Sequence, residues 1–302
     1  MSKEAIEFSE YPFLSVIIPV YNDNTGLKKL LPSLMQQSYP QDKYEVIVVD
    51  NGSNQDVAEI IKDFTVKLLT ENGIQSSYAA RNKGIQHARG EVFVFIDSDC
   101  RAADDWLYEG IKKMHEAGGD LVGGNVVFSF SDKKASAEYY DAIYHFQFED
   151  MIKRGTCGGG NTFVKKSVFD SIGMFPQNIK SGGDVFFTKK ATVSGFKLVY
   201  APEAIVYHPT RKFWPLAGKM FRMAQGKART TKMSAPLLGE KKIKTIQSGG
   251  LWQRLNPLEL RRKIARSSYK VGMAKYFLIL SVTYAILWVG LAGFLYGKVI
   301  KN

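Results

Sequence analysis

Residues 92–99 read VFVFIDSD, an apolar run that ends in two aspartates flanking a serine. A continuous run of β-branched and aromatic residues is typical of a parallel strand buried on both faces. The runs FLSVIIPV at 13–20, YEVIVVD at 44–50 and the apolar stretch at 66–70 have the same character. Between them lie helical spacings behind expected caps at Asn24 and Asp56, namely Leu27, Leu30, Leu31 and Leu34, then Val57, Ile60, Ile61 and Phe64. We therefore predict an α/β fold with a mostly parallel central sheet.

Polar residues follow three of these strands at the point where each strand ends. Ligands of open α/β sheets bind beyond the carboxyl ends of the strands, so these positions are the first candidates for a site. Asp97 and Asp99 are two positions apart and can converge on one hard cation such as Mg²⁺ or Mn²⁺, or cap a turn. Asp50 can accept the ring N–H of uracil or thymine, or close an Asx-turn.

The composition of the 302 residues is that of a globular protein, with 45% hydrophobic residues. The two cysteines, Cys100 and Cys157, exclude a disulfide framework and a four-cysteine zinc site. Charge is uneven: residues 1–210 hold 22 basic and 27 acidic side chains, whereas residues 211–275 hold 17 basic and 2 acidic ones. We expect residues 1–210 to form the catalytic domain and residues 211–275 a basic amphipathic region that contacts anionic membrane lipid.

Residues 276–297 contain no charged side chain, and residues 298–302 form a short tail. The 21 residues from Tyr276 to Tyr296 would make a helix ~32 Å long, enough to cross a bilayer. Basic residues crowd its N-terminal side, so we predict a single-pass transmembrane helix with the catalytic domain on the cytoplasmic face. A buried core helix of a soluble hairpin is the alternative. The start of the chain, MSKEAIEFSE, has no apolar signal region.

Four ordered motifs resemble family-2 glycosyltransferases of the GT-A fold. They are VIIPVYN at 16–22, VIVVDNGS at 46–53, ARNKG at 80–84 and FIDSD at 95–99, and the resemblance covers about residues 13–208. It implies an inverting hexosyltransferase-type enzyme that uses a nucleotide-sugar donor, most simply UDP-linked, with Mn²⁺ or Mg²⁺. The donor-binding residues that it implies are Pro19, Tyr21, Asn22, Asp50, Asn51, Gly52, Arg81, Asp97 and Ser98.

The same resemblance assigns the remaining site residues. Asp99, together with Asp97 and His208, would ligate the cation, although a lone histidine after a strand is also an ordinary core or surface residue. A glycine-rich loop would line the donor sugar and the acceptor, through Gly158, Gly159, Gly160 and Asn161. Without the resemblance this segment reads as a flexible loop.

The resemblance places the catalytic base at Asp184, where the family usually carries a Glu-Asp pair. Here the pair reads Gly183-Asp184, so the neighbouring carboxylate is missing. A carboxylate within hydrogen-bond reach of the acceptor hydroxyl can take its proton. A helix cap is the alternative role, because aspartate is common at helix starts.

The absence of a Gln-x-x-Arg-Trp element after Asp184, together with a single apolar span, favours addition of one sugar over processive synthesis. We expect a lipid-linked or saccharide acceptor in the assembly of a cell-surface polysaccharide or glycolipid. Two other classes of function stay open. The first is a degenerate scaffold that binds a nucleotide sugar or a partner without turnover, suggested by Gly183. The second, nucleic-acid binding by the basic region, has no recognition motif to support it, so nucleic acid is not an expected partner.

Overall fold

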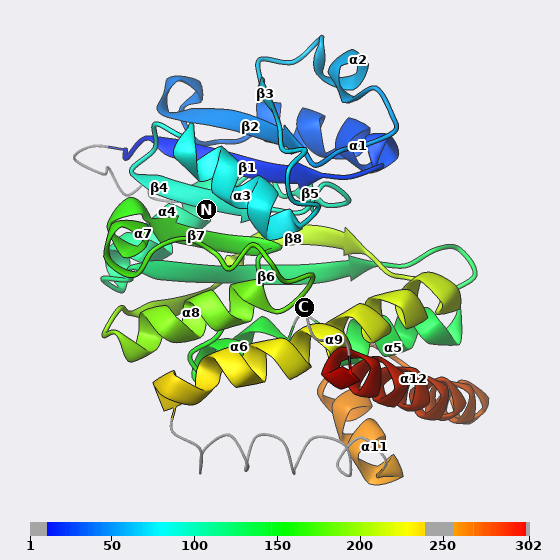
Figure 1. Cartoon of the computed structure of the whole chain (residues 1–302). Coiled ribbons are helices and arrows are strands. Elements are labelled where there is room, and N and C mark those ends of the chain that lie inside the picture. Colours follow the sequence, from blue (N-terminus) through cyan, green and yellow to red (C-terminus); the bar gives the residue numbers. More distant parts are fainter. Residues whose placement is uncertain (1–10, 146, 239–255, 268, 300–302) are drawn as a thin grey trace. The chain divides into compact units, whose positions relative to one another are not determined.

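The computed structural model of the chain describes residues 11–145, 147–238, 256–267 and 269–299 (Figure 1). The strands in this part of the chain are β1 (Leu14–Val20), β2 (Tyr44–Asp50), β3 (Lys67–Thr70), β4 (Val92–Ile96), β5 (Arg101–Ala102), β6 (Leu121–Ser129), β7 (Asn161–Lys165) and β8 (Leu198–Pro209). The helices are α1 (Asn24–Met35), the 3₁₀ turn η1 (Gln41–Lys43), α2 (Val57–Ile61), α3 (Ser77–Gln86), α4 (Trp106–Glu116), α5 (Ser136–Tyr144), α6 (Phe148–Lys153), α7 (Lys166–Ile172), α8 (Gly183–Val193), α9 (Phe213–Leu238), α11 (Pro257–Arg266) and α12 (Met273–Val299).

The chain divides into two compact units that interleave along the sequence. The first unit contains the described residues up to Val127, with Phe148–Asn178 and Phe187–His208. The second unit contains Phe128–Gln147, Ile179–Phe186 and the described residues from Pro209 onward. Two short segments from before residue 210 therefore cluster with the C-terminal helices.

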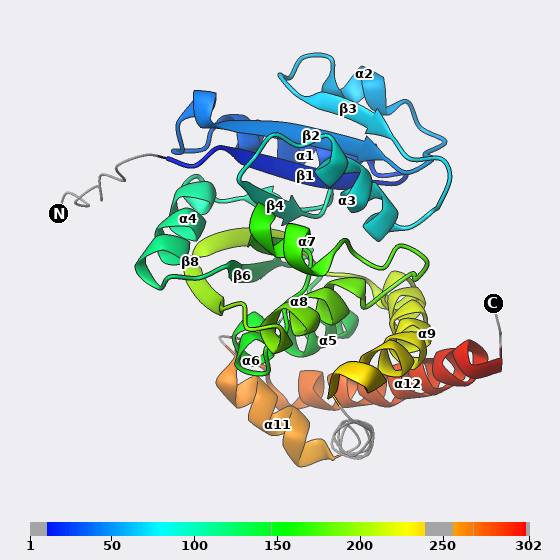
Figure 2. The same cartoon turned by 60° about the vertical axis from the view of Figure 1, so that its left-hand side comes forward.

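The first unit is built on one sheet with the strand order β3-β2-β1-β4-β7-β6-β8-β5 (Figures 1 and 2). Strands β3, β2, β1 and β4 are parallel neighbours, which confirms the predicted mostly parallel sheet. The sequence did not predict β7, which pairs antiparallel with both β4 and β6. Its sequence, NTFVK, is short and half polar, so it lacks the continuous apolar run of the other central strands.

Both faces of this sheet are covered, because alternate residues of each strand point to opposite sides. On one face, alternate strand residues such as Val16 and Val94 form a single buried cluster with Leu27 of α1 and Trp106 of α4. On the other face, Phe95 packs edge-on against Phe169 of α7, with ring centroids 6.0 Å apart. A strand buried in this way needs apolar residues at every position, which is the pattern that the sequence shows.

One local prediction needs correction. Asp23, not Asn24, caps α1: its Oδ1 accepts the amide of Gly26 at 3.0 Å, while the Asn24 side chain donates to the carbonyl of Asp56 at 3.1 Å. Part of the basic region forms one 26-residue helix, α9. The expectations for residues 239–255, for the first ten residues and for 300–302 lie outside the described residues.

Helix α12 contains the whole predicted membrane span, and its 27 residues are long and apolar enough to cross a membrane. Only 28% of its most apolar 18-residue window is buried, so most residues of this window are at least partly exposed. A core helix of a soluble protein would be mostly buried. The candidate span is thus supported by length and composition, while its crossing remains a prediction.

The second unit is organised around a buried carboxylate, Asp141 of α5, which has 0% exposure. One of its oxygens lies 2.5 Å from Nδ1 of His145 and 3.4 Å from Nζ of Lys219. The other accepts the backbone N–H of Arg211 at 2.9 Å. Burial by itself raises the pKa of Asp141, but the His145 hydrogen bond and the Lys219 and Arg211 charges hold that pKa well below its usual range. Helix α5 is thereby tied to the start of α9.

We predict that Asp141→Asn destabilises the protein by about 3–5 kcal/mol, because a buried ion pair loses its anion while the cations stay. The native pKa of Asp141 lies below the unfolded value of about 4, so its stabilisation is present above pH ~4 and is lost as the pH falls further. The variant should lack this acid-dependent loss. Thermal unfolding from pH 7 to pH 3 tests both points. Asp63→Asn, on an exposed carboxylate, is the control and should unfold at the wild-type temperature at pH 7.

Candidate functional site

The carboxyl ends of β1, β2 and β4 lie at one edge of the sheet. In the register of the parallel strands, Val20 pairs with Asp50 and Ile17 pairs with Phe95. The turns that follow these strands are therefore neighbours, as the sequence predicts. The strand ends and these turns carry the expected donor-binding residues Pro19, Tyr21, Asn22, Asp50, Asn51, Gly52, Asp97 and Ser98.

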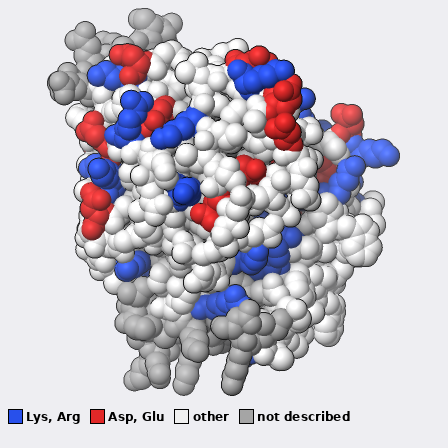
Figure 3. Space-filling model, turned by 45° about the horizontal axis from the view of Figure 1, so that its top comes forward, with Lys and Arg blue, Asp and Glu red and all other residues white. Residues whose placement is uncertain are grey.

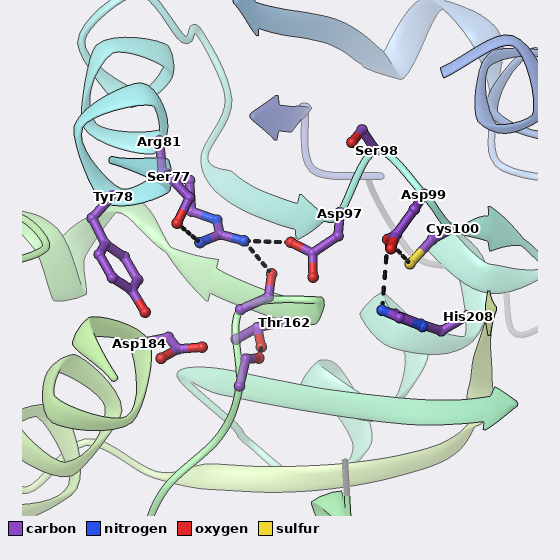
Figure 4. Close-up of polar contacts among 12 residues, drawn as sticks. Ser77, Tyr78, Arg81, Asp97, Ser98, Asp99, Cys100, Thr162, Asp184 and His208 are labelled. Atoms are coloured by element: carbon purple, nitrogen blue, oxygen red, sulfur yellow. Dashed lines mark hydrogen bonds and ion pairs between the residues drawn. The ribbon is translucent and has the colours of Figure 1, made fainter. Parts of the chain in front are cut away.

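The first aspartate after β4, Asp97, is held by a buried arginine (Figure 4). Nη2 of Arg81 lies 2.7 Å from Oδ1 of Asp97, and the Arg81 side chain is only 4% exposed. The same Nη2 donates to the carbonyl of Gly159 at 3.3 Å, and Arg81 also lies over the ring of Tyr78 at 5.8 Å. Arg81 thus joins α3, the end of β4 and the glycine-rich loop, and it fixes the orientation of the Asp97 carboxylate.

The second aspartate, Asp99, meets a histidine that is distant in the sequence. Oδ1 of Asp99 lies 3.6 Å from Nε2 of His208, which lies inside β8 near its end and is 1% exposed (Figure 4). A cation bound to both atoms at about 2.1 Å would hold them about 3.0–3.4 Å apart, so small movements of the two side chains suffice. A carboxylate and an imidazole are suitable donors for Mn²⁺ or Mg²⁺, and Asp99 is partly exposed for a further ligand. The two residues fit the predicted metal role.

Cys100 lies beside this pair, with Sγ 3.7 Å from Oδ1 of Asp99. Burial, followed by the negative charges of Asp99 and Asp97, raises the pKa of the Cys100 thiol well above its ordinary value. A protonated and buried thiol is a poor nucleophile. Cys157 is also buried and free, so both cysteines pack inside the fold.

The turns after β1 and β2 hold one another in place. The backbone N–H of Asn22 donates to Oγ of Ser53 at 2.9 Å, and Oδ1 of Asn22 accepts the N–H of Asn54 at 2.7 Å. Oδ1 of Asp50 accepts the N–H of Ser53 at 3.0 Å, which is the local turn contact expected as the alternative role. Gly52 has φ = 79°, a conformation that glycine adopts without strain. Asp50 is partly exposed, so a ligand can reach it.

Three of the predicted site residues use their side chains inside the fold. The amide of Asn51 donates to the carbonyls of Glu71 and Ile74 at 2.8 and 2.9 Å. The hydroxyl of Ser98 donates to Asp23 at 2.7 Å. These two side chains fix the turns, because their polar atoms already have buried or local partners. A donor contact through them stays a prediction.

Asn161 in the glycine-rich loop is the third such residue. It is fully buried; its Oδ1 accepts the indole N–H of Trp106 at 2.8 Å, and its amide nitrogen donates to the carbonyls of Asn125 and Ala204 at 2.9 and 2.8 Å. Its side chain supports the sheet and does not line a sugar site as expected. The three glycines before it are buried at the end of this loop.

The predicted base, Asp184, lies in the first turn of α8, within the segment Ile179–Phe186 of the second unit. Its Oδ1 accepts the backbone N–H of Val185 at 2.9 Å. This contact is local to the start of the helix, so a structural role at the N-terminus of α8 accompanies any role in catalysis. The general-base assignment remains a prediction.

The sequence analysis missed a second residue of the ARNKG motif. Asn82 is buried, donates to the carbonyl of Phe175 at 2.9 Å and accepts the N–H of Phe175 at 3.1 Å. The motif thus places Arg81 in the site, while Asn82 holds the backbone at Phe175, in the segment that leads to α8. The sequence signal that could have pointed to Asn82 was its position next to Arg81 in a helix with few charged residues.

Basic and acidic side chains are mixed around this part of the protein. In Figure 3 blue and red side chains alternate over the upper part of the visible face, and red patches lie near its centre. Residues 1–210 carry 22 basic and 27 acidic side chains, so no broad positive field covers this region. A diphosphate would therefore depend on local charge, from Arg81 and a bound cation, for its recognition.

Comparison with known proteins agrees with this geometry. Residues 15–173 match the family model described as Glycosyl transferase family 2. Glycosyltransferase AglE of Haloferax volcanii is 37% identical over 287 residues, which cover 91% of this chain and 93% of that protein. The dolichyl N-acetyl-alpha-D-glucosaminyl phosphate 3-beta-D-2,3-diacetamido-2,3-dideoxy-beta-D-glucuronosyltransferase of Methanococcus voltae is 26% identical over 222 residues, covering 66% of this chain and 67% of that protein.

A solved structure shares the fold. Mannosyltransferase PcManGT from Pyrobaculum calidifontis, in complex with GDP-Man and Mn²⁺, aligns with a TM-score of 0.67 and 19% identity, covering 96% of this chain and 89% of that one. At this identity the similarity concerns the fold alone. It confirms the α/β architecture of the GT-A type that the four sequence motifs predicted.

We predict that Gly159→Ala weakens nucleotide binding and destabilises the first unit by about 1–3 kcal/mol, a typical overpacking cost. A Cβ atom at position 159 would lie 3.0 Å from Cζ of Arg81, so the guanidinium that holds Asp97 must shift slightly. Thermal unfolding and calorimetric titration with nucleotide measure the two effects. Gly290→Ala is the control, because a Cβ there has nothing within 4 Å. Wild-type affinity in Gly159→Ala would show that the Arg81 position is irrelevant to the donor.

Proposed function

The chain belongs to glycosyltransferase family 2 and is a glycosyltransferase, and on that premise we propose that it moves a single sugar from a nucleoside-diphosphate sugar to an acceptor hydroxyl with inversion. The observation that carries the proposal is the convergence of Arg81, Asp97, Asp99 and His208 at the carboxyl edge of the sheet. This cluster offers carboxylate, imidazole and guanidinium groups in one place. Such a set suits a donor whose leaving group is a diphosphate.

In this proposal the residues that follow β4 take part in binding the cation and the donor phosphates. Asp99 and His208 would hold Mn²⁺ or Mg²⁺, which when bound supplies positive charge beside the departing diphosphate. Asp97 stays ion-paired with Arg81 at 2.7 Å and faces the same site. The relative from Pyrobaculum calidifontis was solved with Mn²⁺, which supports a divalent cation without deciding between the two ions.

The base-recognising group is Asp50 at the end of β2. Its partly exposed carboxylate can accept the ring N–H of uracil, and we therefore propose a UDP-linked donor as the first candidate. The solved relative was crystallised with GDP-Man. Guanine also presents a ring N–H, so binding of UDP, GDP and CDP should be compared in one titration series. CDP is the expected weakest ligand, because cytosine has no ring N–H at the corresponding position.

The acceptor hydroxyl would lose its proton to Asp184 as its oxygen attacks the anomeric carbon. Single displacement inverts the configuration, so an α-linked donor would give a β-linked product. Gly183 leaves Asp184 without the acidic neighbour common in the family, so Asp184 must orient the acceptor alone.

We further propose a lipid-linked or saccharide acceptor and attachment to the cytoplasmic face of an anionic membrane. Helix α12 provides the apolar surface, and residues 211–275 provide 17 basic side chains against 2 acidic ones. The Methanococcus voltae relative is named for transfer to a dolichyl-phosphate-linked sugar, which supports an acceptor held at a membrane. Assembly of a cell-surface glycan or glycolipid is the proposed setting.

A degenerate scaffold that binds a nucleotide sugar without turnover is the competing proposal, and Gly183 is the observation that favours it. Release of the nucleoside diphosphate, together with mass spectrometry of the product formed from a panel of nucleotide sugars and a membrane-lipid extract, tests the main proposal. A new glycan product supports transfer. Tight donor binding with neither transfer nor hydrolysis across the panel would favour the scaffold.

Asp99→Asn should reduce Mn²⁺ affinity and transfer rate by ~100-fold or more, since loss of an outer-shell partner alone costs about 10–100-fold. The amide keeps the shape of the side chain but loses the charge that holds a hard cation. Calorimetric titration with Mn²⁺ in the presence of nucleotide and an initial-rate assay measure the two quantities. The control is Asp104→Asn, an exposed carboxylate five positions later that should behave as wild type. Undiminished Mn²⁺ binding would remove Asp99 from the metal site.

Asp184→Asn separates the catalytic role from the helix-cap role. Asparagine caps a helix about as well as aspartate, so the melting temperature should stay close to that of wild type. The transfer rate should fall by roughly 10²- to 10⁴-fold with donor affinity preserved, because the base acts on the acceptor. Asp170→Asn, on the exposed side of α7, is the matched control. Wild-type turnover would limit Asp184 to the cap, whereas lost donor binding would reassign it to donor contact.

A further inference from the structure

Helix α12 packs against its own unit at both of its ends. Near its start, Nζ of Lys275 donates to the carbonyl of Lys134 at 2.8 Å. Near its end, Gly297 approaches Gln225 of α9 so closely that an added Cβ would lie 3.0 Å from Cα of Gln225. The helix between Lys275 and Gly297 is ~33 Å long. Contacts with the second unit therefore extend over a length comparable to the thickness of a bilayer core.

The middle of α12 is packed in the same way. Ile286 is fully buried in a cluster that contains Tyr140 of α5 and Leu216 and Met220 of α9. Buried positions recur at helical spacing and, with the half-buried Gly297, form one inner face: Ile279, Thr283, Ile286, Gly293 and Gly297. One side of α12 therefore packs against other helices of the second unit.

Glycines bring the two backbones together on this inner face. A Cβ at Gly293 would lie 2.6 Å from the backbone oxygen of Phe221 in α9. The rings of Phe221 and Tyr296 are 5.6 Å apart. Helices α9 and α12 also lie side by side in both Figure 1 and Figure 2. Gly293 and Gly297 are four residues apart, and this spacing permits a close helix pair.

This packing conflicts with a helix that crosses the membrane alone. The segment of α9 beside the C-terminal half of α12 carries Lys219 and Arg222. Lys219 is itself bound to the buried Asp141, with Nζ 3.4 Å from its carboxylate. If α12 crossed the bilayer, its C-terminal half would carry these charged groups into the hydrocarbon, where charged side chains are strongly unfavourable. Crossing would require the contacts with α9 to break.

In the part of the chain that the structure describes, the opposite face of α12 is exposed and apolar. Trp288 is 73% exposed, and the other large exposed side chains of the face are Phe277, Leu278, Leu295 and Val299. No charged residue occurs from Tyr276 to Gly297. The preceding basic region, with 17 basic and 2 acidic residues from 211 to 275, matches the negative charge of anionic lipid headgroups. An apolar face beside basic residues is typical of a helix that lies in a membrane interface.

We propose that α12 lies in the plane of one leaflet of an anionic membrane, with its inner face on α9 and α5 and its outer face in the acyl chains. Both ends of the helix then stay on the side of the membrane that holds the second unit. This inference rests on the membrane attachment proposed above, and it replaces the crossing helix that the sequence predicts.

The position of α12 affects the segment that carries Asp184, because α9 contacts both α12 and the turn that precedes α8. A Cβ at Gly226 of α9 would lie 2.3 Å from the backbone oxygen of Ser181, and one at Gly182 would lie 3.2 Å from the side chain of Thr230. Asp184 follows this turn directly. Helix α9 therefore connects α12 to the segment of the proposed base, and an in-plane α12 would hold Asp184 at a fixed height above the lipid. A lipid-anchored acceptor presents its hydroxyl groups close to that surface.

Cysteine accessibility in sealed membrane vesicles tests the topology with the full-length protein. The native cysteines are buried, so one reporter cysteine is added after the last residue, and a second variant, Lys62→Cys, marks the first unit on an exposed side chain. A membrane-impermeant maleimide should label both reporters to the same extent without detergent. If detergent is needed for the C-terminal reporter while Cys at 62 labels freely, α12 crosses the bilayer and the in-plane proposal fails, although membrane attachment stands.

A second measurement tests the outer face. Trp288→Lys should weaken partition of the full chain into anionic vesicles by about tenfold or more, because it places a charge on the lipid-facing row. Val193→Lys adds the same charge at an exposed apolar residue of α8 and should leave partition unchanged. Equal partition of Trp288→Lys and wild type would show that this face does not contact lipid, and the in-plane proposal would fail. Failure of wild type to float with vesicles would overturn both this inference and the proposed attachment, while donor binding would be unaffected.

Discussion

The buried guanidinium of Arg81 is the interaction on which the geometry of the site depends. A cation that is 4% exposed needs an anion and hydrogen-bond acceptors within reach, and here they are Asp97 at 2.7 Å and the carbonyl of Gly159 at 3.3 Å. These two partners lie on segments 62 residues apart, so satisfying one charge fixes the end of β4 against the loop before β7. With Asp97 held in this way, Asp99 points to His208 and forms the candidate cation site.

The two units of the chain are stabilised by different means. The first is a sheet with apolar residues on both faces, and its helices cover those faces. The second is a set of helices around Asp141, whose charge is balanced by Lys219, His145 and the start of α9. The proposed donor site belongs to the first unit, whereas the proposed base, Asp184, belongs to the second. Helix α12, which we propose lies against the membrane, belongs to the same unit as Asp184.

The sequence predicted the central strands and the residues that end them because their physical signals are local. A strand buried on both faces must be continuously apolar, and the aspartates after β4 interrupt that run abruptly. Helix α3 gave no such signal: seven of its ten residues, including Arg81 and Asn82, are buried, so no amphipathic stripe marks it. Strand β7 was missed because NTFVK is half polar, and its asparagine is tolerated only through three buried hydrogen bonds.

The sequence by itself determined the fold class, the family, the order of the site motifs and the presence of a long apolar helix near the C-terminus. These features depend on residue type and spacing, which the chain carries without reference to its contacts. Only the tertiary structure decided which polar side chains are available to a ligand: the amides of Asn51 and Asn161 are used by backbone groups of distant segments. It also decided that α12 lies against α9 through Gly293, because close packing of two helices depends on partners that the local sequence does not contain.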